Sequence, residues 1–383
     1  MRRSLFLLIA LTSFAFAPAQ AQELTVPCWW RDTDLSQPWI SADIPCLEEV
    51  INDPALGELA FTALAAAPDG SLYAARPLAG EIWRLVDTND DWLPDTPRLA
   101  ADGLTLPNGL AYAGDVLYIS GGANLYRLRD GEVDVLVDDL PAGPGFWNGG
   151  VAVGPDDRIY VGIGAPCDAC VPDDPERGAI LSFALDGSDR QVVASGLRNP
   201  ADLAFLDGEL WVIDSARDDL FNQPDLDEIN RVEVGAHFGW PHCVGADNQP
   251  DIDGFGCAAA TAPVVSLPTG STPIGLAAYE SDTIPSLTGT LLVALSGSYN
   301  QIELRGYTVA SATVTGDALS YRPIMPAQPE PNTPFTLDEI NYRGSGVWPH
   351  RPYDVTVNTW GWIYISLGGG RILAIRPEAE EGG

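Results

Sequence analysis

The sequence contains no lysine, and its other chemically reactive side chains are scarce. All 20 basic residues are arginine, and the 383 residues include only three histidines, two methionines and six cysteines. Without a lysine amine, Schiff-base chemistry through a lysine side chain is excluded. The 53 Asp and Glu residues bring the formal net charge to −33. This charge disfavours nucleic acids and anionic membranes as partners, and a solvated surface explains it without a specific cationic ligand.

Long hydrophobic runs are also absent, apart from a short one at the N-terminus. Two arginines precede an apolar segment at residues 4–17, and Ala19-Gln20-Ala21 has the small-x-small pattern of a cleavage site. The apolar segment is too short to span a bilayer comfortably. We therefore expect a signal peptide at residues 1–21 and a secreted protein, periplasmic or extracellular, with no membrane span after cleavage. A retained N-terminal anchor is the alternative.

The six cysteines indicate disulfide bonds if the chain is exported. Sequence proximity favours the pairs Cys28–Cys46, Cys167–Cys170 and Cys243–Cys257. The close spacing of the second pair is also compatible with a redox, haem or zinc site. Haem attachment fails because Val171 rather than histidine follows the pair, and zinc would need a second pair of ligands. A disulfide that staples a loop is the better interpretation.

An internal repeat predicts the fold class. Six units recur, each with a small apolar segment, a tight turn, an apolar strand, and a further strand after a polar gap. The best-marked strands lie at residues 72–74, 116–119, 159–161, 210–213, 291–294 and 362–365. Units of this size are typical of four-stranded propeller blades. We predict an all-β, six-bladed β-propeller at residues 57–377, after an N-terminal extension at 22–56 and before a flexible tail at 378–383.

The fourth unit carries an ordered set of motifs that resembles a known family. They are GLRNP at 196–200, RDD at 217–219, DEINRV at 227–232 and GAHFGWP at 235–241. With GPDDRIYV at 154–161, they resemble the soluble glucose and sorbosone dehydrogenases that depend on pyrroloquinoline quinone (PQQ), over about residues 63–376. The resemblance implies PQQ- and calcium-dependent oxidation of a sugar or polyol, with an external electron acceptor.

Propeller geometry would bring several polar side chains together around the axis. The connections that enter the innermost strands of a propeller all lie on one face. The residues that we expect there, and predict to bind the cofactor, are Asn108, Trp147, Asn148, Arg198, Asn199 and Arg351. Arginine pairs and an aromatic ring suit a planar, anionic ligand, and PQQ is such a ligand. The alternative is that each of these residues forms a turn or a rim ion pair.

The general base of the resembling family is missing from its expected place. The family has a histidine just before the inner strand of the third unit, where this chain has Phe146, which cannot accept a proton. Histidines expected near Gly270 and Ser296 are absent too. His350 is the only histidine expected on the funnel face, so we predict it to be the replacement base. The other two histidines, for which we expect packing or capping roles, are His237 and His242.

Two acidic segments are candidates for calcium. The first spaces its oxygens like the opening of a calcium loop but lacks the usual central glycine and terminal glutamate. Its predicted ligands are Asp87, Asn89, Asp91 and Asp95. The second lies in the fourth unit, in the insertion that neighbours the calcium sites of the resembling family. Its predicted ligands are Asp218, Asp219, Asp227 and Glu228. For both segments the alternative is a solvated acidic loop.

Three functions are compatible with the predicted propeller and its motifs. The preferred one is PQQ- and calcium-dependent oxidation of a small-molecule sugar or polyol. The main alternative is a non-catalytic propeller that binds a carbohydrate or protein partner through the funnel. A hydrolase or lactonase with an axial calcium fits the fourth-unit motifs less well.

Overall fold

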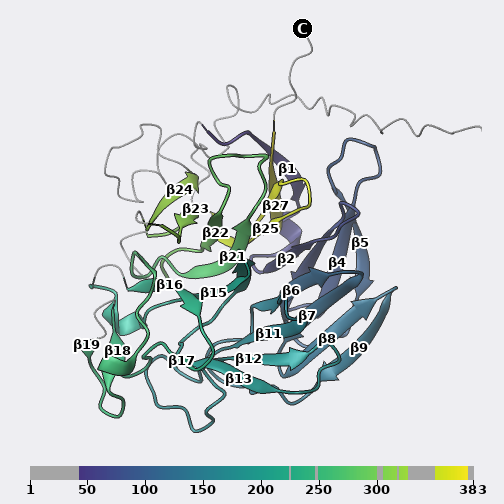
Figure 1. Cartoon of the computed structure of the whole chain (residues 1–383). Coiled ribbons are helices and arrows are strands. Elements are labelled where there is room, and N and C mark those ends of the chain that lie inside the picture. Colours follow the sequence, from purple (N-terminus) through teal and green to yellow (C-terminus); the bar gives the residue numbers. More distant parts are fainter. Residues whose placement is uncertain are drawn as a thin grey trace, which may run out of the picture.

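The computed structural model of the chain describes residues 43–377, apart from 224–225, 246–248, 300–304, 317–318 and 327–349. Six β-sheets radiate around a central axis, and a small hairpin joins β18 (Cys243–Val244) to β19 (Gln249–Pro250) (Figure 1). The described part contains three short 3-10 helices: η1 (Pro54–Leu56), η2 (Asp218–Leu220) and η3 (Cys257–Ala259). The predicted all-β, six-bladed propeller is confirmed. The predicted signal peptide and C-terminal tail lie outside the described residues.

Each of the first three blades begins at the axis and ends at the rim. Blade one consists of β2 (Ala63–Ala66), β3 (Leu72–Arg76), β4 (Glu81–Val86) and β5 (Thr96–Ala101). Blade two consists of β6 (Pro107–Ala113), β7 (Val116–Gly121), β8 (Asn124–Arg129) and β9 (Glu132–Val137). Blade three consists of β10 (Val151–Val153), β11 (Arg158–Ile163), β12 (Ala179–Ala184) and β13 (Gln191–Ser195), with β17 (Ala236–His237) added in parallel.

The last three blades follow the same plan, except that blade six is completed from the N-terminus. Blade four consists of β14 (Leu203–Leu206), β15 (Glu209–Asp214), β16 (Asp227–Val232) and β20 (Val265–Leu267). Blade five consists of β21 (Pro273–Tyr279), β22 (Thr290–Leu295), β23 (Thr308–Thr313) and β24 (Ser320–Met325). Blade six consists of β25 (Pro352–Val357), β26 (Ile363–Leu367), β27 (Arg371–Arg376) and β1 (Cys46–Asn52).

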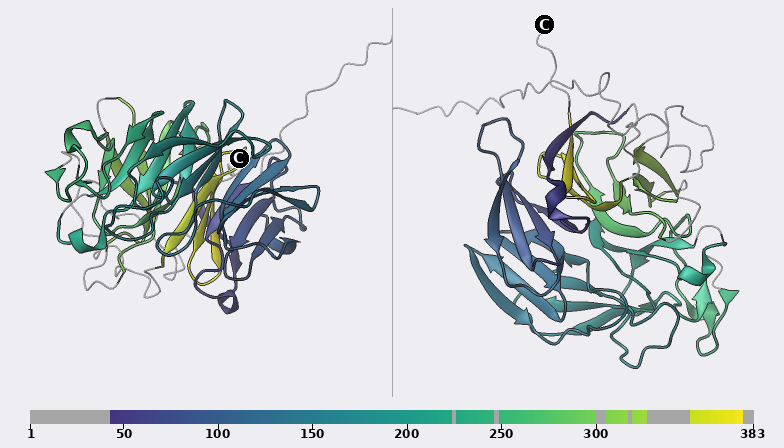
Figure 2. Two further views of the ribbon diagram at one scale, coloured as in Figure 1. Left: turned by 90° about the horizontal axis from the view of Figure 1, so that it is seen from below. Right: turned by 180° about the vertical axis from the view of Figure 1, so that it is seen from behind.

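The antiparallel pair of β1 and β27 closes the ring. In Figure 2 (right) the N-terminal purple strand lies beside the C-terminal yellow one. Residues 46–52 fall within the predicted N-terminal extension. The repeat pattern does not include them, because the other three strands of their blade lie near the C-terminus. The closure ties the two ends of the described chain together by a ladder of backbone hydrogen bonds.

The hydrophobic core lies between the blades rather than at the axis. Six clusters of buried side chains each join two neighbouring blades; one of them packs Trp211 and Ile229 of blade four against Leu276 and Val293 of blade five. All six residues of β22 are buried. Strands covered on both faces need apolar side chains throughout, which is why the sequence shows continuous apolar runs.

The structure also tests the disulfide and membrane predictions. Cys167–Cys170 and Cys243–Cys257 are both bonded, as predicted. The predicted Cys28–Cys46 pair stays a prediction, because Cys28 lies outside the described residues. No helix in the described part of the chain is long and apolar enough to cross a membrane.

One face of the propeller collects the loops that matter for the site. Because the strands of each blade are antiparallel, the loop before the innermost strand and the loop between the second and third strands lie on the same face. We call it the funnel face. Its loops include residues 138–150, 164–178, 196–202, 215–223 and 296–299.

Candidate functional site

Arg198 lies just before β14 and is enclosed by its neighbours on the funnel face. Its Nε donates to Asp168 Oδ1 at 2.8 Å, and its Nη2 donates to Asp218 Oδ1 at 2.8 Å. Nη1 donates to Ser215 Oγ at 3.1 Å. The guanidinium carbon lies 4.2 Å from the ring centre of Phe146, and the residue is 3% exposed. Two carboxylates therefore neutralise this arginine, and its donors are occupied by the protein.

The backbone around Arg198 is fixed by the last residue of β15. Asp214 accepts hydrogen bonds from the backbone N–H of Arg198 at 2.9 Å and of Asn199 at 2.6 Å. Burial raises the pKa of Asp214 to about 6, although these backbone hydrogen bonds favour its charged form. Asn199 is half-buried beside Arg198. The GLRNP motif thus serves at least partly to anchor the entry into blade four.

Blade three contributes one exposed aromatic ring and one structural asparagine. Asn148 is 3% exposed and donates to the carbonyl oxygens of Gly122 at 2.9 Å and Pro141 at 2.8 Å. Its own side-chain oxygen accepts from the Gly164 N–H. Trp147, in contrast, is 40% exposed. Of these two predicted cofactor residues, only the tryptophan presents a free surface to a ligand.

Arg351 lies just before β25 and is held in a different way from Arg198. Its Nη1 donates to the Gly297 carbonyl at 2.7 Å, and its Nη2 donates to the Ser298 carbonyl at 2.8 Å and to Tyr307 Oη at 2.9 Å. The guanidinium carbon lies 3.8 Å from the ring centre of Tyr299, which is 48% exposed. No carboxylate pairs with it among the described residues. Arg351 therefore keeps its full positive charge.

The three histidines differ in their surroundings. His350, next to Arg351, is half-buried, and burial together with the nearby Arg371 lowers its pKa. A neutral imidazole at pH 7 is what a general base requires. His237 stacks on Phe255 with 4.0 Å between ring centres and accepts a hydrogen bond from a backbone N–H, and His242 Nδ1 lies 3.1 Å from a backbone carbonyl oxygen. These two have the packing roles expected of them.

The four acidic residues predicted as calcium ligands in blade four do not converge on one point. Asp218 pairs with Arg198, and Asp219 pairs with Arg217. Asp227 accepts hydrogen bonds from two backbone N–H groups and from a serine hydroxyl. Among the described residues, no group of three or more His, Cys, Asp and Glu side chains is arranged to hold a metal ion.

Glu228 nevertheless faces a second carboxylate. It is paired with Asp214 across β15 and β16, and both residues line a cavity of about 40 Å³. Burial raises the pKa of Glu228 to about 8, and repulsion from Asp214 and Asp227 adds to the effect. Asn230 donates to Glu228, while the buried Oδ1 of this asparagine has no hydrogen-bond partner in the described structure. Of these groups, Asp214 and Glu228 line the cavity, and two neighbouring carboxylates are ligands that a calcium ion prefers.

The other predicted calcium segment lies on the opposite face, between β4 and β5. Asp87 accepts from the backbone N–H groups of Asn89, Asp90 and Trp92, and Asp91 accepts from two further donors. Asp95 accepts from a threonine hydroxyl. The predicted ligands thus organise their own loop through hydrogen bonds, as Asp and Asn commonly do in turns.

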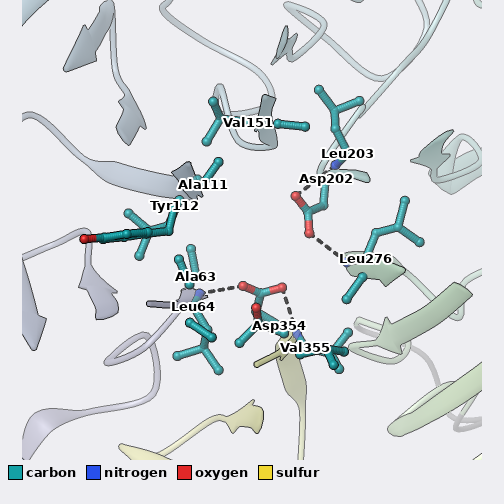
Figure 3. Close-up of a pocket in the computed structure, with 18 of the residues that line it drawn as sticks. Ala63, Leu64, Ala111, Tyr112, Val151, Asp202, Leu203, Leu276, Asp354 and Val355 are labelled. Atoms are coloured by element: carbon teal, nitrogen blue, oxygen red, sulfur yellow. Dashed lines mark hydrogen bonds between the residues drawn. The ribbon is translucent and has the colours of Figure 1, made fainter. Parts of the chain in front are cut away.

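Asn108 lies neither beside Arg198 nor beside Arg351 but in the channel along the axis. This channel has a volume of about 270 Å³ and is lined by the six innermost strands. Two carboxyl groups, of Asp202 and Asp354, point into it (Figure 3). Both residues are missing from the predicted site, although Asp202-Leu203-Ala204 and Asp354-Val355-Thr356 occupy the same place in their repeats.

Comparison with known proteins relates part of the chain to one family. The family model "Glucose / Sorbosone dehydrogenase" matches residues 127–316, from β8 of blade two to just beyond β23 in blade five. The match confirms the predicted resemblance. No curated protein matches the chain.

Solved structures share the fold along nearly the whole chain. The holo PQQ domain of pyranose dehydrogenase from Coprinopsis cinerea is 14% identical, with a TM-score of 0.67 and coverage of 89% of this chain and 97% of that one. The PQQ-bound aldose sugar dehydrogenase from Streptomyces coelicolor is 20% identical, with a TM-score of 0.59 and coverage of 86% and 97%. The apo aldose sugar dehydrogenase from Escherichia coli is 17% identical, with a TM-score of 0.58 and coverage of 87% and 99%. At these identities the similarity demonstrates the shared propeller.

Proposed function

Because the family model of the glucose/sorbosone dehydrogenases matches residues 127–316 of this propeller, we propose that the chain oxidises a sugar or polyol with a PQQ cofactor held on its funnel face and with calcium bound nearby. The observation that supports the proposal best is Arg351, a charged guanidinium with no carboxylate partner in the described structure. It would attract an anionic quinone in a protein that is otherwise strongly acidic. An external electron acceptor would complete the reaction.

The funnel residues fit the quinone unequally. Arg351 offers charge, and the exposed rings of Tyr299 and Trp147 offer surfaces for stacking. Arg198 does not fit as a direct ligand, since Asp168 and Asp218 already neutralise it. Its role would be to position the blade-four loop. When bound, PQQ would supply the two-electron acceptor for the hydride of the substrate.

Proton transfer falls to His350. Its lowered pKa keeps the imidazole neutral at pH 7, so it can take the proton of a substrate hydroxyl. The apolar ring of Phe146 occupies the place where the family has its histidine, and it packs against Arg198 instead. Substrate specificity would come from the polar groups that remain around the funnel.

Calcium would bind where Asp214 and Glu228 face each other. The two carboxylates lie side by side at a small cavity that Arg198 and Arg217 also line, and a divalent cation would offset the burial and the repulsion that raise the pKa of Glu228. Thermal melts in calcium and in chelator test this site, because a ligand that binds only the folded state raises stability. Identical melts for the wild type would remove the calcium proposal.

A second function is favoured by one specific observation. The half-buried ring of Phe146 packs on the guanidinium of Arg198, where we expect the family base, so this part of the funnel offers an aromatic ring and the exposed carboxylate of Asp218 but no proton acceptor of the histidine type. A non-catalytic propeller that binds a carbohydrate through this surface would look the same. For either function we propose export of the chain, in keeping with its two observed disulfides.

Titration of the purified full chain with PQQ in the presence of calcium, with dye reduction measured over aldoses and polyols, separates the two functions. Binding with turnover supports the dehydrogenase, and binding without turnover indicates a propeller that has lost its base. Absence of PQQ binding favours the carbohydrate-binding alternative. His350→Gln should lower turnover more than PQQ affinity, whereas His237→Gln is the matched control and should change neither.

A further inference from the structure

The axial channel contains two acidic side chains and no basic one. Its walls are the edges of the innermost strands β2, β6, β10, β14, β21 and β25. Among the lining residues only Asp202, Asp354 and Tyr112 can titrate, and the other side chains are small, apolar or neutral. Two carboxyl groups deep in a protein normally have a cationic partner or share a proton. Neither arginine nor histidine lines this channel to act as that partner.

Each of the two carboxyl groups reaches from its own blade to the next one. Asp202 of blade four accepts hydrogen bonds from the N–H of Leu203 at 2.9 Å and from that of Leu276, in blade five, at 2.7 Å. Asp354 of blade six accepts from the N–H of Val355 at 2.8 Å and from that of Leu64, in blade one. Figure 3 shows both groups turned into the channel and toward each other.

The surroundings leave this pair electrostatically unfavourable when both groups are ionised. Burial raises the pKa of Asp202 to about 7. Burial and the neighbouring Asp202 raise the pKa of Asp354 well above its usual range. The backbone N–H groups favour the charged forms but do not outweigh the loss of solvent, and a hydrogen bond between the two carboxyl groups lowers the pKa of Asp202 and raises that of Asp354. Without a cation the pair is therefore expected to share a proton, which a bound cation would replace. A positive ion between the two groups would offset both the loss of solvent and the repulsion between the carboxylates.

A separate observation also points to a ligand at this place. Thr62, which directly precedes the innermost strand of blade one, lines the same channel and is 9% exposed. Its buried hydroxyl oxygen has no hydrogen-bond partner in the described part of the protein. Asn108 of blade two lines the channel as well and carries an amide oxygen. Blades one, two, four and six thus each bring an oxygen-bearing side chain to the axis.

We propose that the axial channel binds a divalent cation of the calcium class through Asp202 and Asp354, with Thr62 and Asn108 as neutral oxygen ligands. Oxygen-only ligands select a hard cation, and two carboxylates balance its charge. The site is distinct from the Asp214–Glu228 pair and does not depend on the proposed oxidation. A cation here would link blades four, five, six and one at the axis, so it would stabilise the ring.

Calcium titration calorimetry on the chelator-treated full chain tests the site. Asp202→Asn keeps one of the two oxygens that accept backbone hydrogen bonds but removes the charge, so it should weaken one class of calcium site by about tenfold or more. Asp207→Asn makes the same change at an exposed position in the same blade and should bind calcium like the wild type. Glu228→Gln should leave the axial site intact, which separates this proposal from the calcium site proposed above.

Two further variants keep the test decisive if Asp202→Asn folds poorly. Asp354→Asn should give the same loss, and Thr62→Val, which only removes a hydroxyl, should give a smaller one. The calcium-induced rise in melting temperature should shrink in the same order. The proposal is overturned if the folded Asp202→Asn or Asp354→Asn protein binds calcium with wild-type stoichiometry and affinity. It is also overturned if the Glu228→Gln variant binds no calcium at all.

Discussion

Arg198 and Arg351 occupy equivalent places in blades four and six, yet their surroundings give them different chemistry. Each directly or nearly precedes an innermost strand and contacts an aromatic ring on the funnel face. Arg198 is paired with the carboxylates of Asp168 and Asp218, whereas Arg351 is bonded to carbonyl oxygens and a phenol. The first is electrically neutralised and the second is not. A motif therefore conveys where an arginine lies but not whether its charge is available.

The largest effect is expected when the charged arginine is removed. Arg351→Ala should weaken PQQ binding by about tenfold or more, because the guanidinium attracts an anionic ligand by its charge even though both Nη atoms already donate to carbonyl oxygens and a phenol. Arg351→Lys keeps the charge but loses the planar geometry, so its affinity should lie between the two. Absorbance titration of PQQ measures both. Equal affinity of the wild type and Arg351→Ala would show that the quinone, if bound, is not held by this residue.

Removal of the neutralised arginine should instead affect stability. A broken buried ion pair can cost about 3–5 kcal/mol. Here Asp168 and Asp218 are 37% and 86% exposed and can be solvated once Arg198 is gone, so we expect about 2 kcal/mol for Arg198→Ala. The melting temperature should fall by several degrees. An unchanged melt with a complete loss of PQQ binding would reverse the roles that we assign to the two arginines.

The Cys167–Cys170 bridge distinguishes the two arginines, because it holds a partner of Arg198 and none of Arg351 among the described residues. Asp168 lies between these cysteines and accepts from both Arg198 and the Asp218 backbone N–H. Closing so short a loop contributes about 2 kcal/mol at most. A Cys167→Ser, Cys170→Ser double variant should lose about 1–2 kcal/mol and keep the PQQ affinity that Arg351 provides. Chemical denaturation and PQQ titration of the same sample measure the two quantities.

The sequence was informative wherever the cause of a structure is local or periodic. Six apolar units predict six blades, and cysteines close in sequence predict the two bridges that the structure describes. The failures all involve partners that are distant in sequence. Arg198 is neutralised by Asp168 across 30 residues, and Leu64 caps Asp354 across 290. No spacing rule connects such pairs, because the packing of neighbouring blades brings Arg198 and Asp168 together and the closure of the ring brings Leu64 and Asp354 together.

The smallest expected effect is on the pH dependence of folding stability, to which His237 and His350 should both contribute. Burial lowers the pKa of both His237 and His350, so the folded protein favours the neutral imidazole. As pH falls through about 6.5, the unfolded chain takes up these protons before the folded one does, and stability is lost until each lowered pKa is reached. His237→Gln should therefore become more stable relative to the wild type as pH falls from about 6.5 to 5, a difference that urea denaturation measures. The buried carboxyl groups with raised pKa values give the opposite trend, but they are common to both proteins and cancel in the difference. His350→Gln should give a difference of the same sign, and it should also reduce turnover at every pH, because only this histidine adjoins the charged arginine. A difference from the wild type that does not change with pH would show that neither histidine contributes to the pH dependence of stability in this range.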